Sequence, residues 1–351
     1  MKLCFFVDDS FAPFALSFNK EGHDVIINKF SIDSDVIISE SYFYMYEILR
    51  NLKQIKKNNI KIINFILDIP PWRLKKSLDI YSLVKYIKQL NYHYSHRAPN
   101  IYNILNDYLK NMKKTRAGKI NKQLINKIFN TYYNNYINYQ KNYRSFLKKN
   151  DIVLSISRNT QYSAKKFLNI DSKICYFGVN SDLLSKIPEY PIKYDVINIS
   201  RVVKTKRQNL IVEAAKKLNL KVAIFGKLQD KTIKLDCPVY YFPNHIDVLK
   251  ELNKTRFYVD ASIFEGFGMT PLEAAFLNKI TIASDTFVHK EILGDYPLYF
   301  KRDNLKDLVE KMKMVLNGDF ILNEKTIKIL RNKFSFERCR KNLLSHIESL
   351  F

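Results

Sequence analysis

Residues 261–294 read ASIFEGFGMTPLEAAFLNKITIASDTFVHKEILG, and this stretch decides the predicted fold. An apolar strand is expected over Tyr258–Ile263, shortly before the carboxylate of Glu265. The loop that follows, Gly266-Phe267-Gly268, contains two residues without a Cβ atom, so a ligand can approach its backbone closely. The pattern therefore predicts a strand followed by a ligand-binding loop.

A helix is expected after this loop, because Pro271 is typical of a first helical position and Thr270 of a helix cap. The free N–H groups at a helix start, here those of Met269 and Thr270, suit a phosphate. Glu273 lies eight residues after Glu265, in the expected first turn, and both carboxylates can accept hydrogen bonds from hydroxyl groups. The stretch predicts a ligand with phosphate and hydroxyl groups, such as a nucleotide sugar. An ordinary strand-loop-helix unit of another Rossmann-like protein is the alternative.

The sequence EGFGMTPLEA begins at Glu265, and TIASD and EILGD follow it. Together these motifs resemble the Glu-x7-Glu signature of family 4 glycosyltransferases. The resemblance implies an α/β protein of GT-B architecture, in which two Rossmann-like domains with parallel sheets face each other across a cleft. It also implies sugar transfer with retention of configuration, with Glu265 at the transferred sugar and Glu273 at the ribose. The other donor-binding residues that it implies are Gly226, Asn244, Gly266, Phe267, Gly268, Met269 and Thr270.

The length of 351 residues fits two domains. By the resemblance, residues 1–185 with the C-terminal helix 335–351 form an acceptor-binding domain, and residues 195–334 form the donor-binding domain. Phe334-Ser335-Phe336-Glu337 resembles the start of the family's terminal helix, which crosses back onto the first domain, with Ser335 as the cap.

Two cations follow the strand expected over Asp195–Ser200, namely Arg201 and Lys206. Such a pair suits a diphosphate, which arginine binds in bidentate fashion and lysine as a point charge. The element resembles the family's Gly-Arg-Leu…Lys-Gly sequence, with Ser200 and Arg207 in place of the two glycines. We therefore expect Arg201, Lys206 and Glu265 to be catalytic, with no metal site and no cofactor besides the donor substrate.

The first half of the chain offers candidates on the acceptor side. Asp8 and Asp9 follow the strand expected at the N-terminus, where the family usually has glycines, and acids there would face an acceptor hydroxyl or a basic side chain. Asp68 follows the strand expected over Lys61–Leu67 and is the further catalytic candidate, with a turn cap as an equal alternative. Trp72 lies close by in sequence and is a second acceptor candidate. His245 follows a strand expected in the second half, and we interpret it as a loop residue rather than a general base.

The net charge is +24, and the segment 73–149 carries 17 Lys and Arg against 2 acids, or 17 − 2 = +15. Such a field attracts an anionic acceptor, a membrane surface or nucleic acid. Lys113, Lys114 and Arg116 are the strongest candidates for this contact. The alternative is compositional drift, because Lys is abundant throughout the chain.

No signal peptide or membrane span is expected, and four scattered cysteines predict reduced thiols. A cytoplasmic protein is predicted, with peripheral attachment to the inner face of the membrane as a variant. Three other functions stay open: a phage-type transferase acting on DNA bases, an inverting transferase, and a non-enzymatic sugar-binding protein of the same fold. Binding that weakens steeply with salt would indicate DNA, and the product anomer would identify inversion.

Overall fold

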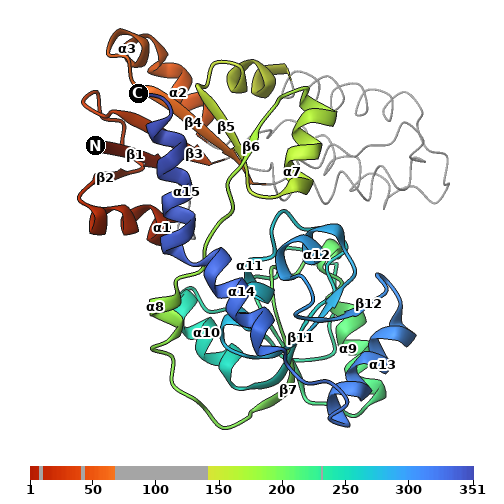
Figure 1. Cartoon of the computed structure of the whole chain (residues 1–351). Coiled ribbons are helices and arrows are strands. Elements are labelled where there is room, and N and C mark those ends of the chain that lie inside the picture. Colours follow the sequence, from red (N-terminus) through yellow and green to blue (C-terminus); the bar gives the residue numbers. More distant parts are fainter. Residues whose placement is uncertain (8–10, 41–43, 68–140, 231) are drawn as a thin grey trace, which may run out of the picture. The chain divides into compact units, whose positions relative to one another are not determined.

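The computed structural model describes residues 1–7, 11–40, 44–67, 141–230 and 232–351, drawn as coloured ribbons in Figure 1. The chain divides into two compact units, Met1–Asp68 with Lys149–Phe351, and Ile69–Lys148. In the second unit, residues 141–147 are helical, as expected of the basic segment. Seven predicted site residues lie outside the described residues, and their roles stay predictions: Asp8, Asp9, Asp68, Trp72, Lys113, Lys114 and Arg116.

Six parallel strands form the sheet of the N-terminal half, in the order β2-β1-β3-β4-β5-β6. Strand β1 is buried along almost its whole length, as is typical of a parallel strand covered on both faces. The strands are β1 Lys2–Phe6, β2 Asp24–Ile27, β3 Val36–Glu40, β4 Lys61–Ile66, β5 Ile152–Ser155 and β6 Lys173–Ile174.

Short helices connect these strands, including a 3-10 turn (η1) and a π-helical turn (η2). Ser157 caps the helix that follows β5, because its hydroxyl accepts a hydrogen bond from the Thr160 N–H group. The helical segments are α1 Ala12–Leu16, η1 Ser17–Glu21, α2 Met45–Arg50, α3 Leu52–Lys57, α7 Arg158–Ser163, η2 Ala164–Leu168 and α8 Ser181–Leu184.

The sheet of the C-terminal half also has six parallel strands, in the order β12-β11-β10-β7-β8-β9. The strand order reverses between β7 and β10, and ligands of such sheets bind beyond the carboxyl ends of the strands at this point. The strands are β7 Tyr194–Ile199, β8 Val222–Phe225, β9 Val239–Tyr240, β10 Thr255–Asp260, β11 Ile280–Ser284 and β12 Leu298–Phe300.

Helices cover both faces of this second sheet. On β7, Val196 packs in one cluster with Ile211 of α9 and Leu308 of α13, while Ile197 packs in another cluster with residues such as Leu249 of α10. This alternation follows from the two-residue period of a strand. The helical segments are η3 Lys204–Lys206, α9 Gln208–Lys217, α10 His245–Asn253, α11 Met269–Phe276, α12 Phe287–Leu293, α13 Leu305–Leu316, α14 Glu324–Phe334 and α15 Phe336–Glu348.

The last helix contacts elements of the N-terminal half (Figure 1). Ser335 caps α15 as predicted, because its hydroxyl accepts the Arg338 N–H group at 3.2 Å. Arg340 Nε donates to Glu21 Oε1 at 2.6 Å. Gly178 allows the close approach of the chain before α15, since a Cβ atom there would lie 2.9 Å from the Ser335 carbonyl oxygen.

Two further expectations concern the whole chain. The four cysteines are all free, and burial raises the pKa of the Cys4 thiol to about 11. Among the described residues, no helix combines the length and the apolar composition that crossing a bilayer requires.

Candidate functional site

Two loops lie at the point where the order of the second sheet reverses, one after β7 and one after β10. The Ile263 N–H group of the second loop donates to the Thr205 carbonyl of the first at 2.9 Å. The first loop carries Arg201 and Lys206, and the second carries Glu265. The fold therefore brings together, at the expected ligand edge, two segments that are about sixty residues apart in sequence.

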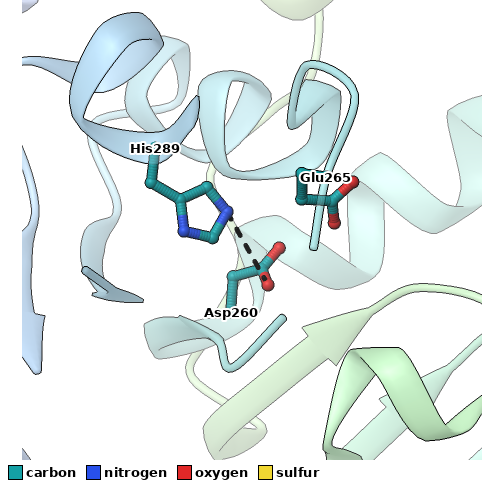
Figure 2. A group of neighbouring side chains, drawn as sticks. All are labelled: Asp260, Glu265 and His289. Atoms are coloured by element: carbon teal, nitrogen blue, oxygen red, sulfur yellow. Dashed lines mark ion pairs between the residues drawn. The ribbon is translucent and has the colours of Figure 1, made fainter. Parts of the chain in front are cut away.

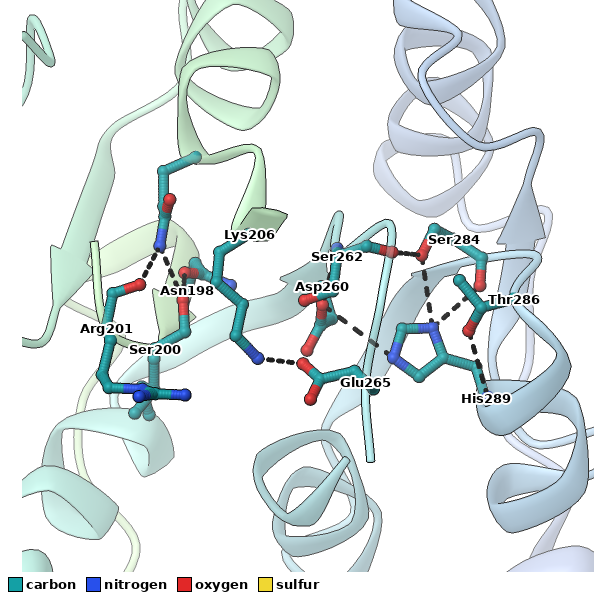
Figure 3. Close-up of polar contacts among 12 residues, drawn as sticks. Asn198, Ser200, Arg201, Lys206, Asp260, Ser262, Glu265, Ser284, Thr286 and His289 are labelled. Atoms are coloured by element: carbon teal, nitrogen blue, oxygen red, sulfur yellow. Dashed lines mark hydrogen bonds and ion pairs between the residues drawn. The ribbon is translucent and has the colours of Figure 1, made fainter. Parts of the chain in front are cut away.

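The loop after β7 is fixed by a chain of hydrogen bonds shown in Figure 3. Asn198 Nδ2 donates to the Val259 carbonyl at 2.8 Å, and the Ser200 hydroxyl donates to Asn198 Oδ1 at 2.7 Å. Gln208 Nε2 then donates both to Ser200 Oγ at 2.7 Å and to the Arg201 carbonyl at 2.9 Å. Ser200, which stands where the family has a glycine, thus acts as a structural link.

Two backbone positions shape this loop. Gly226, predicted at the donor, follows β8, and a Cβ atom there would lie 2.0 Å from the Ser200 carbonyl oxygen. Glycine is therefore required by contact with the neighbouring loop. Arg207 adopts φ 53° and ψ 33°, the left-handed conformation that glycine takes most easily, so arginine makes at this position a turn that suits glycine. Its guanidinium pairs with Asp303, with 2.7 Å between Nε and Oδ1.

Lys206 and Glu265, two of the predicted catalytic residues, form an ion pair (Figure 3). Both side chains are mostly buried, with 14% and 13% of their surface exposed. Arg201 is exposed instead, and within the described part of the chain its guanidinium takes part in no ion pair. One predicted cation is thus bound to a carboxylate, while the other is available to an anion.

The helix after the loop begins earlier than predicted. Helix α11 starts at Met269, and its N-cap is Gly268 in the left-handed conformation at φ 87°, without a side-chain cap. The prediction of Thr270 as cap was therefore wrong: the turn of Gly268 already sets the direction of the helix. The strand before it was also placed too late, because β10 ends at Asp260.

Glu273 is the fifth residue of α11, so it lies in the second turn and not in the first as predicted. It is 6% exposed. His245, interpreted from sequence as a loop residue, is the first residue of α10, and its Nε2 lies 2.7 Å from Glu273 Oε1. This hydrogen bond and the charge of Glu273 raise the pKa of His245 above its usual value. The position of His245 just beyond a strand end was the signal that could have identified it.

Asp260 and His289 are site residues that the sequence analysis missed. Both are buried beside Glu265, as Figure 2 shows. His289 Nδ1 lies 2.8 Å from the Ser284 carbonyl, which only accepts, so Nδ1 carries a proton, and Nε2 faces Asp260 Oδ1 at 3.9 Å. Burial of Asp260 would raise its pKa, but the charges of His289 and Lys206, with hydrogen bonds from Ser262, hold that pKa below its usual value.

These three side chains could hold a divalent cation. Asp260, Glu265 and His289 each offer one ligand atom, and these atoms lie within 4.8 Å of one another. Carboxylate oxygen and imidazole nitrogen are ligands that several divalent metals accept. The ammonium group of Lys206 already pairs with Glu265, so a metal ion would compete with it. Independence from metal stays a prediction.

Other donor-binding candidates are held by contacts of their own. The Gly266 carbonyl accepts a hydrogen bond from the Ser157 hydroxyl at 2.8 Å. Phe267 is buried against Phe177 and Phe334, so its side chain is not open to a ligand. Asn244 caps α10 by accepting the Ile246 N–H group at 3.0 Å. These contacts are structural, and donor binding by these residues stays a prediction.

One family matches the sequence: residues 182–333 match the family described as Glycosyl transferases group 1. No curated protein sequence matches the chain.

Several solved structures share the fold over the whole chain. Sucrose-phosphate synthase from Thermosynechococcus elongatus is 10% identical with a TM-score of 0.66, and the alignment covers 100% of this chain and 99% of the synthase. A glycosyltransferase from Rickettsia africae is 17% identical with a TM-score of 0.55, covering 99% and 98%. HepE from Anabaena, solved with UDP-glucose, is 11% identical with a TM-score of 0.59, covering 99% and 100%. The GT-B fold predicted from the sequence is thereby confirmed.

Proposed function

We propose that this chain, whose residues 182–333 match the Glycosyl transferases group 1 family, is a nucleotide-sugar-dependent glycosyltransferase. We also propose its donor, the course of its reaction and the class of its acceptor. The observation that supports the proposal most is the meeting of Lys206 and Glu265 at the reversal point of the second sheet. A cation for the phosphates and a carboxylate for the sugar hydroxyls lie in contact there.

The proposed donor is a UDP-linked hexose. HepE, which shares this fold, was solved with UDP-glucose. In our proposal the diphosphate binds between Arg201, Lys206 and the first N–H groups of α11, where the partial positive charge of a helix start favours an anion. Glu273 accepts hydrogen bonds from the ribose, and Glu265 from the transferred hexose.

The proposed reaction breaks the bond between the anomeric carbon and the diphosphate and forms a bond from that carbon to an acceptor hydroxyl on the same face. Negative charge develops on the leaving UDP. It is stabilised by groups that already point toward it before the bond breaks, namely Arg201, Lys206 and the N–H groups of Met269 and Thr270. The departing phosphate takes the proton of the acceptor hydroxyl. The configuration of the sugar is retained, and the cations replace a divalent metal.

The proposed acceptor is anionic or lies at a membrane surface. Its support is the net charge of +15 over residues 73–149, obtained as 17 − 2. A lipid-linked acceptor predicts binding to vesicles that depends on anionic lipid. Binding to DNA that falls steeply with salt would instead favour the transferase acting on DNA bases.

Thermal unfolding of the protein with a panel of nucleotide sugars tests the donor. A ligand that binds only the folded state raises the midpoint of unfolding, so UDP-hexoses should raise it more than GDP- or ADP-hexoses do. The NMR spectrum of the product of donor hydrolysis or transfer then gives the anomer. A product of inverted configuration would refute the retaining mechanism, and the absence of stabilisation by any nucleotide sugar would refute the donor site.

A further inference from the structure

A histidine and a glutamate from different helices are in contact beyond the carboxyl ends of β9 and β10. His245 opens α10, and Glu273 lies in α11. His245 Nε2 and Glu273 Oε1 are 2.7 Å apart. A carboxylate only accepts hydrogen bonds, so the proton of this contact belongs to Nε2 of His245. Asn244 fixes the position of His245, because its side chain caps the same helix.

The second oxygen of Glu273 has no such partner. Oε2 is buried and finds no hydrogen-bond donor among the described residues. A buried carboxylate oxygen without a donor is unfavourable, because it has lost its bonds to water without replacement. His245 therefore holds one oxygen of Glu273 in place and leaves the other as an acceptor for a ligand. The His245 side chain is 57% exposed, whereas that of Glu273 is 8% exposed, so solvent reaches the histidine side of this pair.

We propose that His245 is a positioning residue for Glu273 and that the pair discriminates ribose from deoxyribose in the nucleotide of the donor. This inference rests on the proposed function, since it assumes that a nucleoside diphosphate binds at this edge. The free oxygen of Glu273 accepts a hydrogen bond from a ribose hydroxyl. Without the hydrogen bond from His245, the carboxylate turns toward water or another donor, and the discrimination is lost.

The test compares UDP with 2′,3′-dideoxy-UDP, by calorimetric titration of the full chain. The wild-type protein should bind UDP at least about ten-fold more tightly, because a site that hydrogen-bonds a hydroxyl group rejects an analogue without it. His245→Phe, which keeps a ring but has no donor, should raise the Kd for UDP about ten-fold and leave the Kd for dideoxy-UDP within about two-fold. His245→Gln, whose amide can still donate, should keep most of the preference for UDP.

His346→Phe is the matched control, since it makes the same change in α15 and should alter neither affinity. The inference would be overturned if His245→Phe weakened the binding of UDP and of dideoxy-UDP equally, or weakened the binding of neither. Binding of UDP by the wild-type protein would still leave the proposed function standing. If the wild-type protein binds neither nucleotide, the proposed function fails, and the inference fails with it.

Discussion

Glu265 and Glu273 belong to one motif, but the two regions around them neutralise their charge in different ways. Glu265, in the loop after β10, pairs with Lys206, and both side chains are mostly buried. Glu273, in helix α11, is itself buried but pairs with the more exposed His245. Lysine stays charged over the physiological pH range, whereas histidine changes its charge within it.

This difference indicates separate tasks for the two glutamates. Glu265 lies beside the buried Asp260 and His289 (Figure 2), where an unpaired negative charge would be costly, so a permanent cation suits it. Glu273 lies next to an exposed ring and keeps one oxygen free. We expect the first region to govern the rate of transfer and the second to govern the affinity for the nucleotide.

The largest effect is expected from breaking the pair of Lys206 and Glu265. Lys206→Met and Glu265→Gln should each lower kcat by about 10²- to 10³-fold, as removal of a group that stabilises developing charge does. The double variant should lose little more than either single variant, because the two residues act as a unit. Initial rates of sugar transfer measure all three.

Lys216→Met is the control, since Lys216 forms an ion pair with Asp236 on the exposed surface and its loss should leave kcat unchanged. Losses in the double variant equal to the product of the two single losses would show that the residues act independently, contrary to our account.

A smaller effect is expected from the second glutamate. Glu273→Gln should raise the Kd for UDP about ten- to a hundred-fold, because hydrogen bonds to a charged acceptor are replaced by weaker ones. The turnover at saturating donor should change much less. Kd from calorimetry and kcat from initial rates separate the two, and Glu310→Gln on the exposed surface of α13 is the control. A large drop in kcat with an unchanged Kd would reverse the roles of the two regions.

The pH dependence of stability should be smaller still. The pKa of His245 is raised in the folded state, so the wild-type advantage over His245→Gln should be complete below about pH 6.5 and disappear as the pH rises through the raised pKa. Because the His245 side chain is 57% exposed, the advantage should not exceed about 1 kcal/mol. Urea unfolding of both proteins at pH 6 and pH 9 measures it. An advantage that grows with pH would contradict the proton assignment.

The smallest effect is expected from removing metal ions. Since Lys206 supplies the positive charge beside Glu265, treatment with EDTA should change the rate of transfer by less than about two-fold. Loss of activity that Mn²⁺ or Mg²⁺ restores would show instead that Asp260, Glu265 and His289 hold an ion.

The sequence predicted the elements that have a strong local signal. The glycine-flanked loop, the cations after β7 and the Ser335 cap depend on residues close together in the chain, so their patterns were visible. The parallel sheets followed from the family resemblance and from alternating strands and helices. The boundaries of β10 and α11 were each misplaced by a few residues. The start of α11 was missed because Gly268 rather than Thr270 is the N-cap.

The rest depends on contacts between distant segments, which a single sequence does not reveal. Glycine at 226 is required by the Ser200 carbonyl of a neighbouring loop, and no local pattern shows this. The same holds for His289, which reaches Asp260 only after the strands have paired. Arg207 in place of a glycine left the geometry of its turn open until its left-handed conformation was seen.

A crystal structure of the protein with UDP tests the central claim most directly. Our account predicts the diphosphate within hydrogen-bond distance of Arg201, Lys206 and the first N–H groups of α11, with a ribose hydroxyl on Glu273 Oε2. Nucleotide bound elsewhere, with Arg201 and Glu273 both remote from it, would contradict the account.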